Sequence, residues 1–562
     1  MTNVLEVDDL IFKHLCEHDL SQCARVNKTW YTITIPYLWG DLSDMSETMG
    51  SLFGNPQARD GFGKMVLEDY LHEQKYGKAG HSQLATMSTL AKYGRWIRLL
   101  PDPDDFLELF DKTLESHKGL VGRGEKPTAY ELLFHLFQHC PTAQIQYLSL
   151  EYERLGSDNL WRTTVEYVLP RTCFLYVDAQ YHGPHPKFRE LTNLLSRCSS
   201  ALTRLELTVK ISYTDEEMKD PKEAQEETES KETESEEWTS LKYLNLFRCN
   251  DNSGSKAFWS WLWKRCGHVE ELNGIEIDGF AQSLAEGMVH MPKVEKLQLG
   301  SVGLCAPTLT DDDFAAILSG SSKGLKVVKA RRSIKFGART VEALAKHFST
   351  IEELDLELGE DHCVSHGPLR VLSSGCNLRT LTTLEGSCFI ETYPRMDATV
   401  FIDQDPTTGV LRPWPCEASL KVLSAKITGI PRPDLPGHET VKETYPGQGR
   451  EIQSKVYDRL ARLTHLEILC LGRQPFSRFD SIYEDEDNFA CLELSLESGL
   501  GKLEGLKMLK ELDVSRLMTK IGRIEVQWMI EHWPRLHTIH GLERASKDAI
   551  AWLREHRPHV QW

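Results

Sequence analysis

Few groups of residues in this 562-residue chain combine the types and the spacing that catalysis requires. A G-x-S-x-G motif occurs at residues 320–324, and its serine could act as a nucleophile only in a sharp turn that follows a strand and precedes a helix. Here a helix-like stretch, residues 314–318, precedes the motif, and a strand-like stretch begins after it at Leu325. Because this order is reversed, we interpret the motif as a flexible turn.

The sequence offers equally little support for a metal centre. His362, Cys363 and His366 lie close together, but no second pair of ligands with matching spacing accompanies them. The fourteen cysteines include no C-x-x-C pair, and there is no P-loop, dinucleotide-binding fingerprint or H-E-x-x-H motif. We therefore predict that the chain is not an enzyme and uses no cofactor and no metal.

Composition narrows the classes of partner. The chain has 65 basic and 83 acidic side chains, a net charge of -18, which disfavours sequence-independent binding to nucleic acid or to an anionic membrane. No apolar run reaches the roughly 18 residues of a membrane-spanning helix, and acids stand where a signal peptide would have basic residues. We expect a cytoplasmic or nuclear protein that binds neither nucleic acid nor membrane.

The first 45 residues read as three short helices. Asp8 and Asp9 suit the first turn of one helix, Asp19 suits the N-cap of the next, and Pro36 ends the last. Such a small segment cannot bury its many large apolar side chains within one core of its own. Part of this surface should therefore meet a partner protein.

The patterns L-x(4)-L-I-F-x(2)-L, D-L-x(2)-C-A-x-V-x(3)-W and P-x-L-W follow each other in this segment, which is similar to the F-box signature over its whole length. Families with that motif bind a Skp-type adaptor and, through it, a cullin-RING ligase. The family's usual proline after the first leucine is replaced by Glu6. The resemblance implies that the following residues divide between the helical core and the adaptor interface: Leu5, Ile11, Phe12, Leu15, Leu20, Val26, Trp30, Leu38 and Trp39. The alternative is an ordinary helical cap.

The rest of the chain repeats an L-x-x-L-x-L core in which Ile, Val or Ala can replace leucine. Clear copies begin at residues 145, 202, 241, 294, 325, 351, 420, 466 and 509, and weaker copies begin at 269, 378 and 536. Successive starts from 241 to 378 are 28, 25, 31, 26 and 27 residues apart, close to the period of leucine-rich repeats. Helix-like stretches lie between the cores. The pattern predicts an α/β fold in which a small N-terminal three-helix F-box precedes an αβ-horseshoe of irregular leucine-rich repeats.

Stacked repeats would leave the polar residues between core positions on one long strand face. From these we select Asn245, Gln298, Lys329 and Asp355 as candidate contacts to a substrate protein. One repeat places basic residues beside acids of the next, which predicts either mutual neutralisation or a polar hot spot. The residues concerned are Lys326, Lys329, Arg331 and Arg332, and Glu352, Glu353, Asp355 and Glu357.

The predicted domains are an F-box at 1–45, a helical linker and start of the array at 46–140, and repeats at 141–562. Residues 214–237 hold twelve acids against three lysines and predict a disordered insertion. Residues 394–415, 431–449 and 473–487 are rich in Pro, Gly or acids and are expected to be loops, whereas 546–556 suggests a terminal helix.

The whole pattern resembles the F-box and leucine-rich-repeat proteins, especially divergent fungal forms. The resemblance implies a substrate-recognition adaptor of a Skp-cullin-F-box ubiquitin ligase, which binds the adaptor through the F-box and a substrate protein through the repeats. The alternative is a leucine-rich-repeat scaffold or a GTPase-regulator-like interaction protein without a ligase role.

Overall fold

The computed structural model describes part of the chain in two compact units, unit 1 (Met1–Asn245 and Asn252–His268) and unit 2 (Leu246–Asp251 and Val269–Trp562). The described residues are 34, 58–76, 97, 99–100, 103–121, 127–140, 143–151, 165, 167–182, 188–198, 200–212, 237–249, 256–275, 280–300, 309–334, 338–358, 378–382, 395–434, 443–472, 492–515, 517, 519–542 and 546–562. Except for the buried helical residue Thr34, residues 1–45, for which the sequence predicts an F-box, lie outside them, as do residues 213–236 and the group at 362–366.

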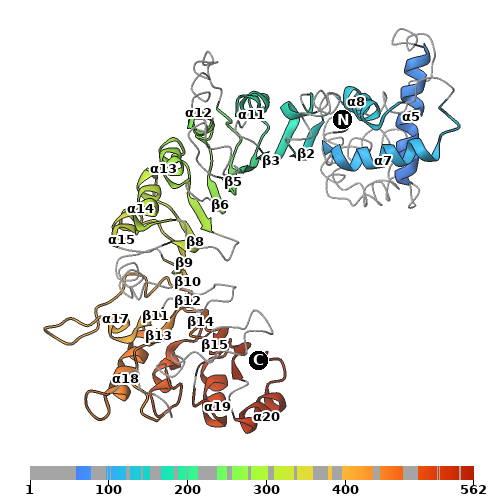
Figure 1. Ribbon diagram of the computed structural model, residues 1–562. Helices are drawn as coiled ribbons and strands as arrows, with labels where there is room; N and C mark the ends of the chain where they lie inside the picture. The colour runs from blue at the N-terminus through green and yellow to red at the C-terminus, as the bar shows by residue number, and fades with distance from the viewer. Residues whose placement is uncertain are drawn as a thin grey trace, which may run out of the picture. The chain divides into compact units, whose positions relative to one another are not determined.

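In unit 1, helices α5, α7 and α8 accompany the first of the parallel strands, which follow the order β1-β2-β3-β4 (Figure 1). Its elements are α5 (Ala58–Tyr76), β1 (Leu99–Leu100), α7 (Pro103–Ser116), α8 (Ala129–His139), β2 (Gln144–Glu151), β3 (Thr172–His182), α11 (Phe188–Leu195), β4 (Arg204–Ser212), β5 (Tyr243–Phe247) and α12 (Lys256–Trp263), with a 3₁₀ turn at Leu169–Arg171. A capping box fixes the start of α8, where the Thr128 side chain accepts from the Glu131 amide and the Glu131 carboxylate accepts from the Thr128 amide.

The core of these strands follows the period of two expected for strands. Leu148, Leu175 and Leu205 lie opposite one another in register and are fully buried. The next core residues, Leu150, Val177 and Leu207, repeat the pattern two positions later. Residues between them point to the other side of the sheet and are half-buried. One side of the sheet is therefore the core, and the other is an open strand face.

The sequence pattern missed β3. Its first core position is Thr172, which pairs in register with Ile145 of β2 although threonine is not among the residues allowed by the motif. The Thr172 side chain is completely buried, and its hydroxyl donates a hydrogen bond to the carbonyl oxygen of Val168 at 3.2 Å. A satisfied hydroxyl can occupy an apolar position at little cost.

Unit 2 continues the alternation, with parallel strands in the order β6-β7-β8-β9-β10-β12-β14-β15-β16. Its elements are β6 (Glu271–Ile275), α13 (Ala281–His290), β7 (Lys296–Gly300), α14 (Asp311–Gly320), β8 (Val327–Ile334), α15 (Ala338–Ala345), β9 (Glu353–Leu358), β10 (Thr380–Thr382), β11 (Arg395–Asp397), α17 (Ala398–Ile402), β12 (Val422–Ser424), β13 (Lys426–Thr428), α18 (Gln448–Ala461), β14 (Ile468–Cys470), β15 (Glu511–Asp513), α19 (Arg523–His532), β16 (Thr538–His540) and α20 (Lys547–His556), with a 3₁₀ helix at Leu500–Gly505. Helices α13, α14 and α15 stand in a row on one side of the strands (Figure 1).

Each predicted repeat core, strong or weak, contains one of these strands, so the chain has a leucine-rich-repeat-like α/β fold. The G-x-S-x-G motif is a turn, because α14 ends at Gly320 and β8 begins at Val327. Gly320 serves helix packing, since a Cβ there would lie 2.8 Å from the Cβ of Met288 on α13. Among the described helices, none is long and apolar enough to cross a membrane.

The prediction that residues 394–415 form a loop was wrong for residues 395–402, which form a strand and a helix. Strand β11 pairs in parallel with β13, and α17 follows it directly, capped by the Asp397 carboxylate, which accepts from the Thr399 amide at 2.9 Å. Phe401 and Trp414 are buried, with an edge-to-face contact at 5.2 Å between ring centroids. The many Pro, Gly and polar residues concealed a small second sheet because it needs only three residues per strand.

Candidate functional site

The open strand face carries the four residues selected from the sequence. Asn245, in unit 1, is half-buried, and its Oδ1 has no hydrogen-bond partner among the described residues. In unit 2, Gln298, Lys329 and Asp355 lie side by side in register on β7, β8 and β9. Gln298 and Lys329 are half-buried, whereas Asp355 is 5% exposed. Whether any of the four contacts a substrate stays a prediction.

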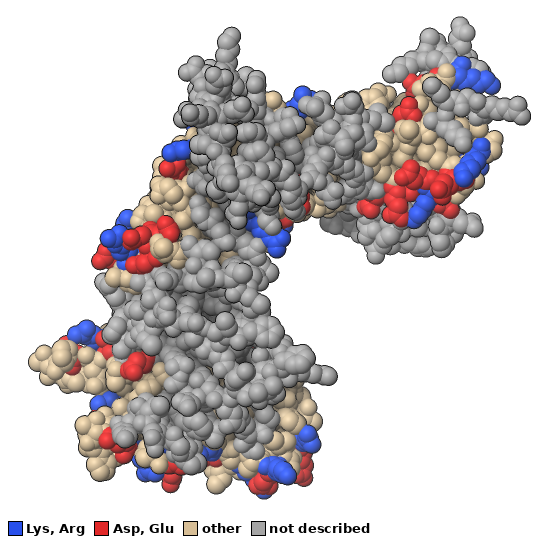
Figure 2. Space-filling model, viewed as in Figure 1, with Lys and Arg blue, Asp and Glu red and all other residues tan. Residues whose placement is uncertain are grey.

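Neighbouring repeats neutralise each other's charge at these strands. Lys329 forms an ion pair with Glu353 of the next strand at 2.8 Å, and Lys326 pairs with Glu295 of the preceding repeat at 2.6 Å. The hydrogen bond to Glu295 raises the pKa of the Lys326 ammonium. The helix side is similarly mixed, because Figure 2 shows blue and red atoms side by side at α14 and α15, where Arg339 pairs with Asp312. Mutual neutralisation therefore accounts for part of the charge contrast seen in the sequence.

In unit 1 the same open strand face carries aromatic and arginine side chains, which follow one another across four strands. Tyr147 on β2 is in register with Phe174 on β3, and their rings meet edge to face at 4.7 Å. Arg204 on β4 is in register with Phe174, and its guanidinium lies 4.6 Å from that ring and 4.1 Å from the ring of Tyr243 on β5. We call Tyr147, Phe174, Arg204 and Tyr243 the aromatic ladder.

Glu206 holds the guanidinium of Arg204 in place in the absence of a partner protein. Glu206, two residues along β4, accepts hydrogen bonds from Nε of Arg204 at 2.9 Å and from Nη2 at 2.5 Å. The Arg204 side chain is nevertheless 43% exposed, and Glu206 is 18% exposed. A preorganised arginine between aromatic faces can bind a partner's carboxylate or aromatic side chain with little further loss of conformational entropy.

Sequence reasoning missed this ladder although a signal was present. The chosen column lay between the last two core positions, whereas the ladder occupies the position just before the second core residue. Three of its members, Tyr147, Arg204 and Tyr243, occur in motifs that were recognised, and the fourth, Phe174, lies in the overlooked strand β3. The equivalent positions of β6, β7, β8 and β9 are Glu271, Lys296, Val327 and Glu353, so the ladder does not continue there.

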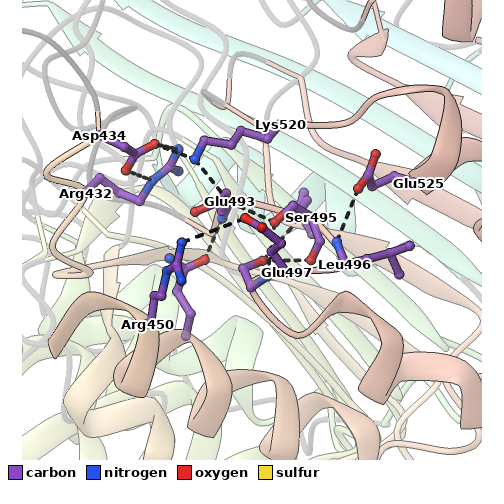
Figure 3. Close-up of polar contacts among 12 residues, drawn as sticks. Arg432, Asp434, Arg450, Glu493, Ser495, Leu496, Glu497, Lys520 and Glu525 are labelled. Carbon is purple, nitrogen blue, oxygen red and sulfur yellow. Dashed lines mark hydrogen bonds and ion pairs between the residues drawn. The ribbon is translucent and has the colours of Figure 1, made fainter. Parts of the chain in front are cut away.

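Unit 2 contains a cluster of charged side chains (Figure 3). It links the segments that follow β13, β14 and β15. Arg432, 1% exposed, donates from Nε to Asp434 Oδ1 at 3.0 Å and from Nη2 to Oδ2 at 3.1 Å. Lys520 bridges Asp434 at 3.1 Å and Glu493 at 3.2 Å. Burial alone would raise the pKa of Asp434, but the hydrogen bonds from Arg432 and Lys520 outweigh it and hold this pKa far below its usual range.

Asp434→Asn should therefore destabilise the protein in a pH-dependent way. A carboxyl whose pKa is lowered by folding contributes stability above its unfolded pKa of about 4, and this contribution is lost as the pH falls below that value. We expect a loss of about 1.5 kcal/mol at pH 7 that is constant down to pH ~5 and shrinks below pH ~4. Urea unfolding of both proteins from pH 7 to pH 3 measures this, and a difference that grows on acidification would contradict it.

Comparison with known proteins adds little to this geometry. No family model matches the chain, and no curated protein matches it. The crystal structure of the Rad7 and Elc1 complex in yeast is similar at 14% identity and a TM-score of 0.27, covering 57% of this chain and 80% of that one. The TLR13-ssRNA13 complex is similar at 14% identity and a TM-score of 0.28, covering 80% of this chain and 62% of that one. Scores this low assign no family, so the fold assignment rests on the strand register.

Proposed function

We propose that this chain is a substrate-recognition subunit of a Skp-cullin-F-box ubiquitin ligase. In this proposal residues 1–45 bind the Skp-type adaptor, and the open strand face binds a substrate protein. The chain itself supplies no catalytic group and is not an enzyme. It accelerates ubiquitin transfer by raising the effective concentration of substrate lysines near the activated ubiquitin.

The aromatic ladder is the observation that carries the substrate-binding part of the proposal. Tyrosine and arginine are enriched among the residues that contribute most of the binding energy at protein interfaces. Here two tyrosines and one arginine, with Phe174 among them, lie on four adjacent strands, and Glu206 holds the partly exposed Arg204 side chain in place. The ligase part of the proposal is supported by the F-box-like spacing of the first 45 residues.

Leu20→Ala and Trp30→Ala should each abolish binding to a Skp-type adaptor while leaving the repeats folded. Both residues occupy positions of the F-box-like motif, whereas Trp562 is 41% exposed at the other end of the chain, so Trp562→Ala is a matched control that should bind normally. Co-purification with the adaptor, with circular dichroism as a check of folding, provides the measurement. Retained binding in both variants would contradict the proposal that residues 1–45 bind the adaptor. The chain would then be a repeat scaffold whose activity does not require these residues.

Arg204→Glu should weaken substrate capture without affecting the adaptor. Reversing the charge places a carboxylate beside Glu206 and between two aromatic rings, and we expect at least about a 10-fold loss of substrate binding. Proteins that co-purify with the adaptor-bound chain and become ubiquitinated in its presence are quantified for the wild type, Arg204→Glu and Tyr243→Ala. Lys264→Glu, an exposed charge reversal next to α12, is the control. Identical substrate sets in all four proteins would show that the ladder does not bind substrate.

A further inference from the structure

Two helices of unit 1 place two histidines and two carboxylates against one another. Asp69 and Glu73 lie one turn apart on α5, and His135 and His139 lie one turn apart on α8. Residues spaced by four share one face of a helix, so each helix presents a pair of potential metal ligands to the other. Helices α5 and α8 thus bring together residues that are 66 positions apart in the sequence.

The distances suit a shared cation. Asp69 Oδ2 lies 3.0 Å from His135 Nε2 and 3.9 Å from His139 Nε2, and Glu73 Oε2 lies 3.4 Å from His139 Nε2. The ligand atoms of Asp69, His135 and His139 all lie within 4.8 Å of one another. Two ligands of a tetrahedral zinc ion, each about 2.0–2.1 Å from the metal, are separated by about 3.4 Å.

These four side chains are largely buried and face one another. Asp69 and His135 are each 5% exposed, Glu73 is 14% exposed and His139 is 23% exposed. The two nitrogens of His135 face different carboxylates, Nε2 toward Asp69 and Nδ1 toward Glu73 at 3.5 Å. A neutral imidazole has a single N–H, so an imidazole that donates from Nδ1 to Glu73 offers the lone pair of Nε2 to a cation that it can share with Asp69.

We propose that Asp69, His135 and His139 bind a divalent transition-metal ion, with Zn²⁺ as the expected occupant, and that Glu73 holds His135 in place through its Nδ1. Imidazole nitrogens favour zinc and its neighbours over Mg²⁺ or Ca²⁺, which prefer ligand sets made of oxygen. Two imidazoles and one carboxylate form a ligand set that zinc accepts, and a carboxylate that accepts a hydrogen bond from the other nitrogen of a ligating imidazole fixes the orientation of that ring.

Such an ion would secure the start of the repeat sheet. Helix α8 leads directly into β2, and its C-terminal carbonyls at Phe137 and Cys140 accept hydrogen bonds from Arg171, next to β3. Joining α5 to α8 would therefore couple α5, which precedes β1, to the strands β2 and β3. End units of repeat arrays need such reinforcement because they have a neighbour on one side only.

The experiment titrates Zn²⁺ into the chelator-treated full chain by calorimetry and follows the melting temperature in parallel. We expect one Zn²⁺ per chain, a higher melting temperature with Zn²⁺ than with Mg²⁺, and an affinity at least about 100-fold lower in His139→Ala and about 10-fold lower in Glu73→Gln. His72→Ala, which removes an exposed histidine from the same helix, is the matched control and should bind like the wild type.

Cobalt separates this site from binding to the cysteines. The wild type minus His139→Ala difference spectrum should show visible Co²⁺ bands without thiolate charge-transfer absorption, because no cysteine is among the three ligands. Glu73→Gln nearly preserves side-chain shape, and its circular dichroism spectrum checks that it folds. Absence of stoichiometric Zn²⁺ binding by the wild type, equal affinity in His139→Ala or Glu73→Gln, or a thiolate band in the difference spectrum would each overturn the proposal and leave histidine–carboxylate ion pairs at this position.

Discussion

Arg459→Ala is expected to lower the free energy of unfolding by about 3–5 kcal/mol, because it leaves buried acceptors without their donor. Arg459 on α18 is fully buried, and its guanidinium lies 4.3 Å from the ring centroid of Trp414. Nη1 donates to the Arg412 carbonyl at 2.5 Å and to Glu417 Oε1 at 3.0 Å. Nη2 donates to the Ile402 carbonyl at 2.7 Å and to the Asp403 carbonyl at 3.2 Å.

These bonds hold the insertion at residues 395–417 against α18, so the same substitution should loosen α17 before the rest of unit 2. Urea unfolding measures the free energy, and hydrogen exchange of residues 398–402 reports the local effect. Arg450→Ala on the same helix is the control, because Arg450 is 71% exposed and its pair with Glu497 at 3.8 Å should contribute less than about 1 kcal/mol. Equal losses in the two variants would show that the buried arginine is not what secures the insertion.

Gly541→Ala should cost about 3 kcal/mol or more, because a side chain there is both strained and obstructed. Gly541 follows β16 with φ +89°, a conformation that residues with a Cβ adopt only at a cost of about 1–2 kcal/mol. An added Cβ would also lie 2.3 Å from the backbone nitrogen of Ser515, which follows the neighbouring strand β15. Overpacking against backbone adds about 1–3 kcal/mol.

Two other glycines separate these contributions. Gly409 has φ +68° with open space where an added Cβ would lie, so Gly409→Ala should show the conformational cost alone, about 1–2 kcal/mol. Gly472, which follows β14, has no positive φ, but its Cβ would lie 2.2 Å from the Ser515 carbonyl oxygen, so Gly472→Ala should show the steric cost alone. Urea unfolding of the three variants tests this order, and a Gly541→Ala loss no larger than that of Gly409→Ala would contradict it.

Much of the fold could be predicted from local patterns in the sequence. The alternation of apolar and polar residues in the L-x-x-L-x-L cores predicted every described strand of the main sheet from β4 to β10, together with β2, β12, β14, β15 and β16. It did so because strand periodicity is a property of neighbouring residues and needs no knowledge of the rest of the chain. The pattern failed at Thr172, where a hydrogen bond to Val168 makes a polar residue acceptable in the core.

The candidate sites were less accessible to this reasoning because they join distant segments. Arg204 was visible in its motif, but its position between Phe174 and Tyr243 depends on the register of three strands. The cluster in Figure 3 joins Arg432 and Asp434 to Lys520, which no spacing in the sequence connects. The buried acceptors of Arg459 lie 42 to 57 residues away from it.

The sequence by itself therefore determined the repeat period, the strand–helix alternation, the strand-face positions and the F-box-like spacing on which the proposed function rests. Only the tertiary structure decided which of these side chains meet: the aromatic ladder, the small sheet around Trp414, and the pairing of Asp69 and Glu73 with His135 and His139. The physical reason is that repeat cores are specified by spacings of two or three residues, whereas a site depends on contacts whose sequence separation is arbitrary.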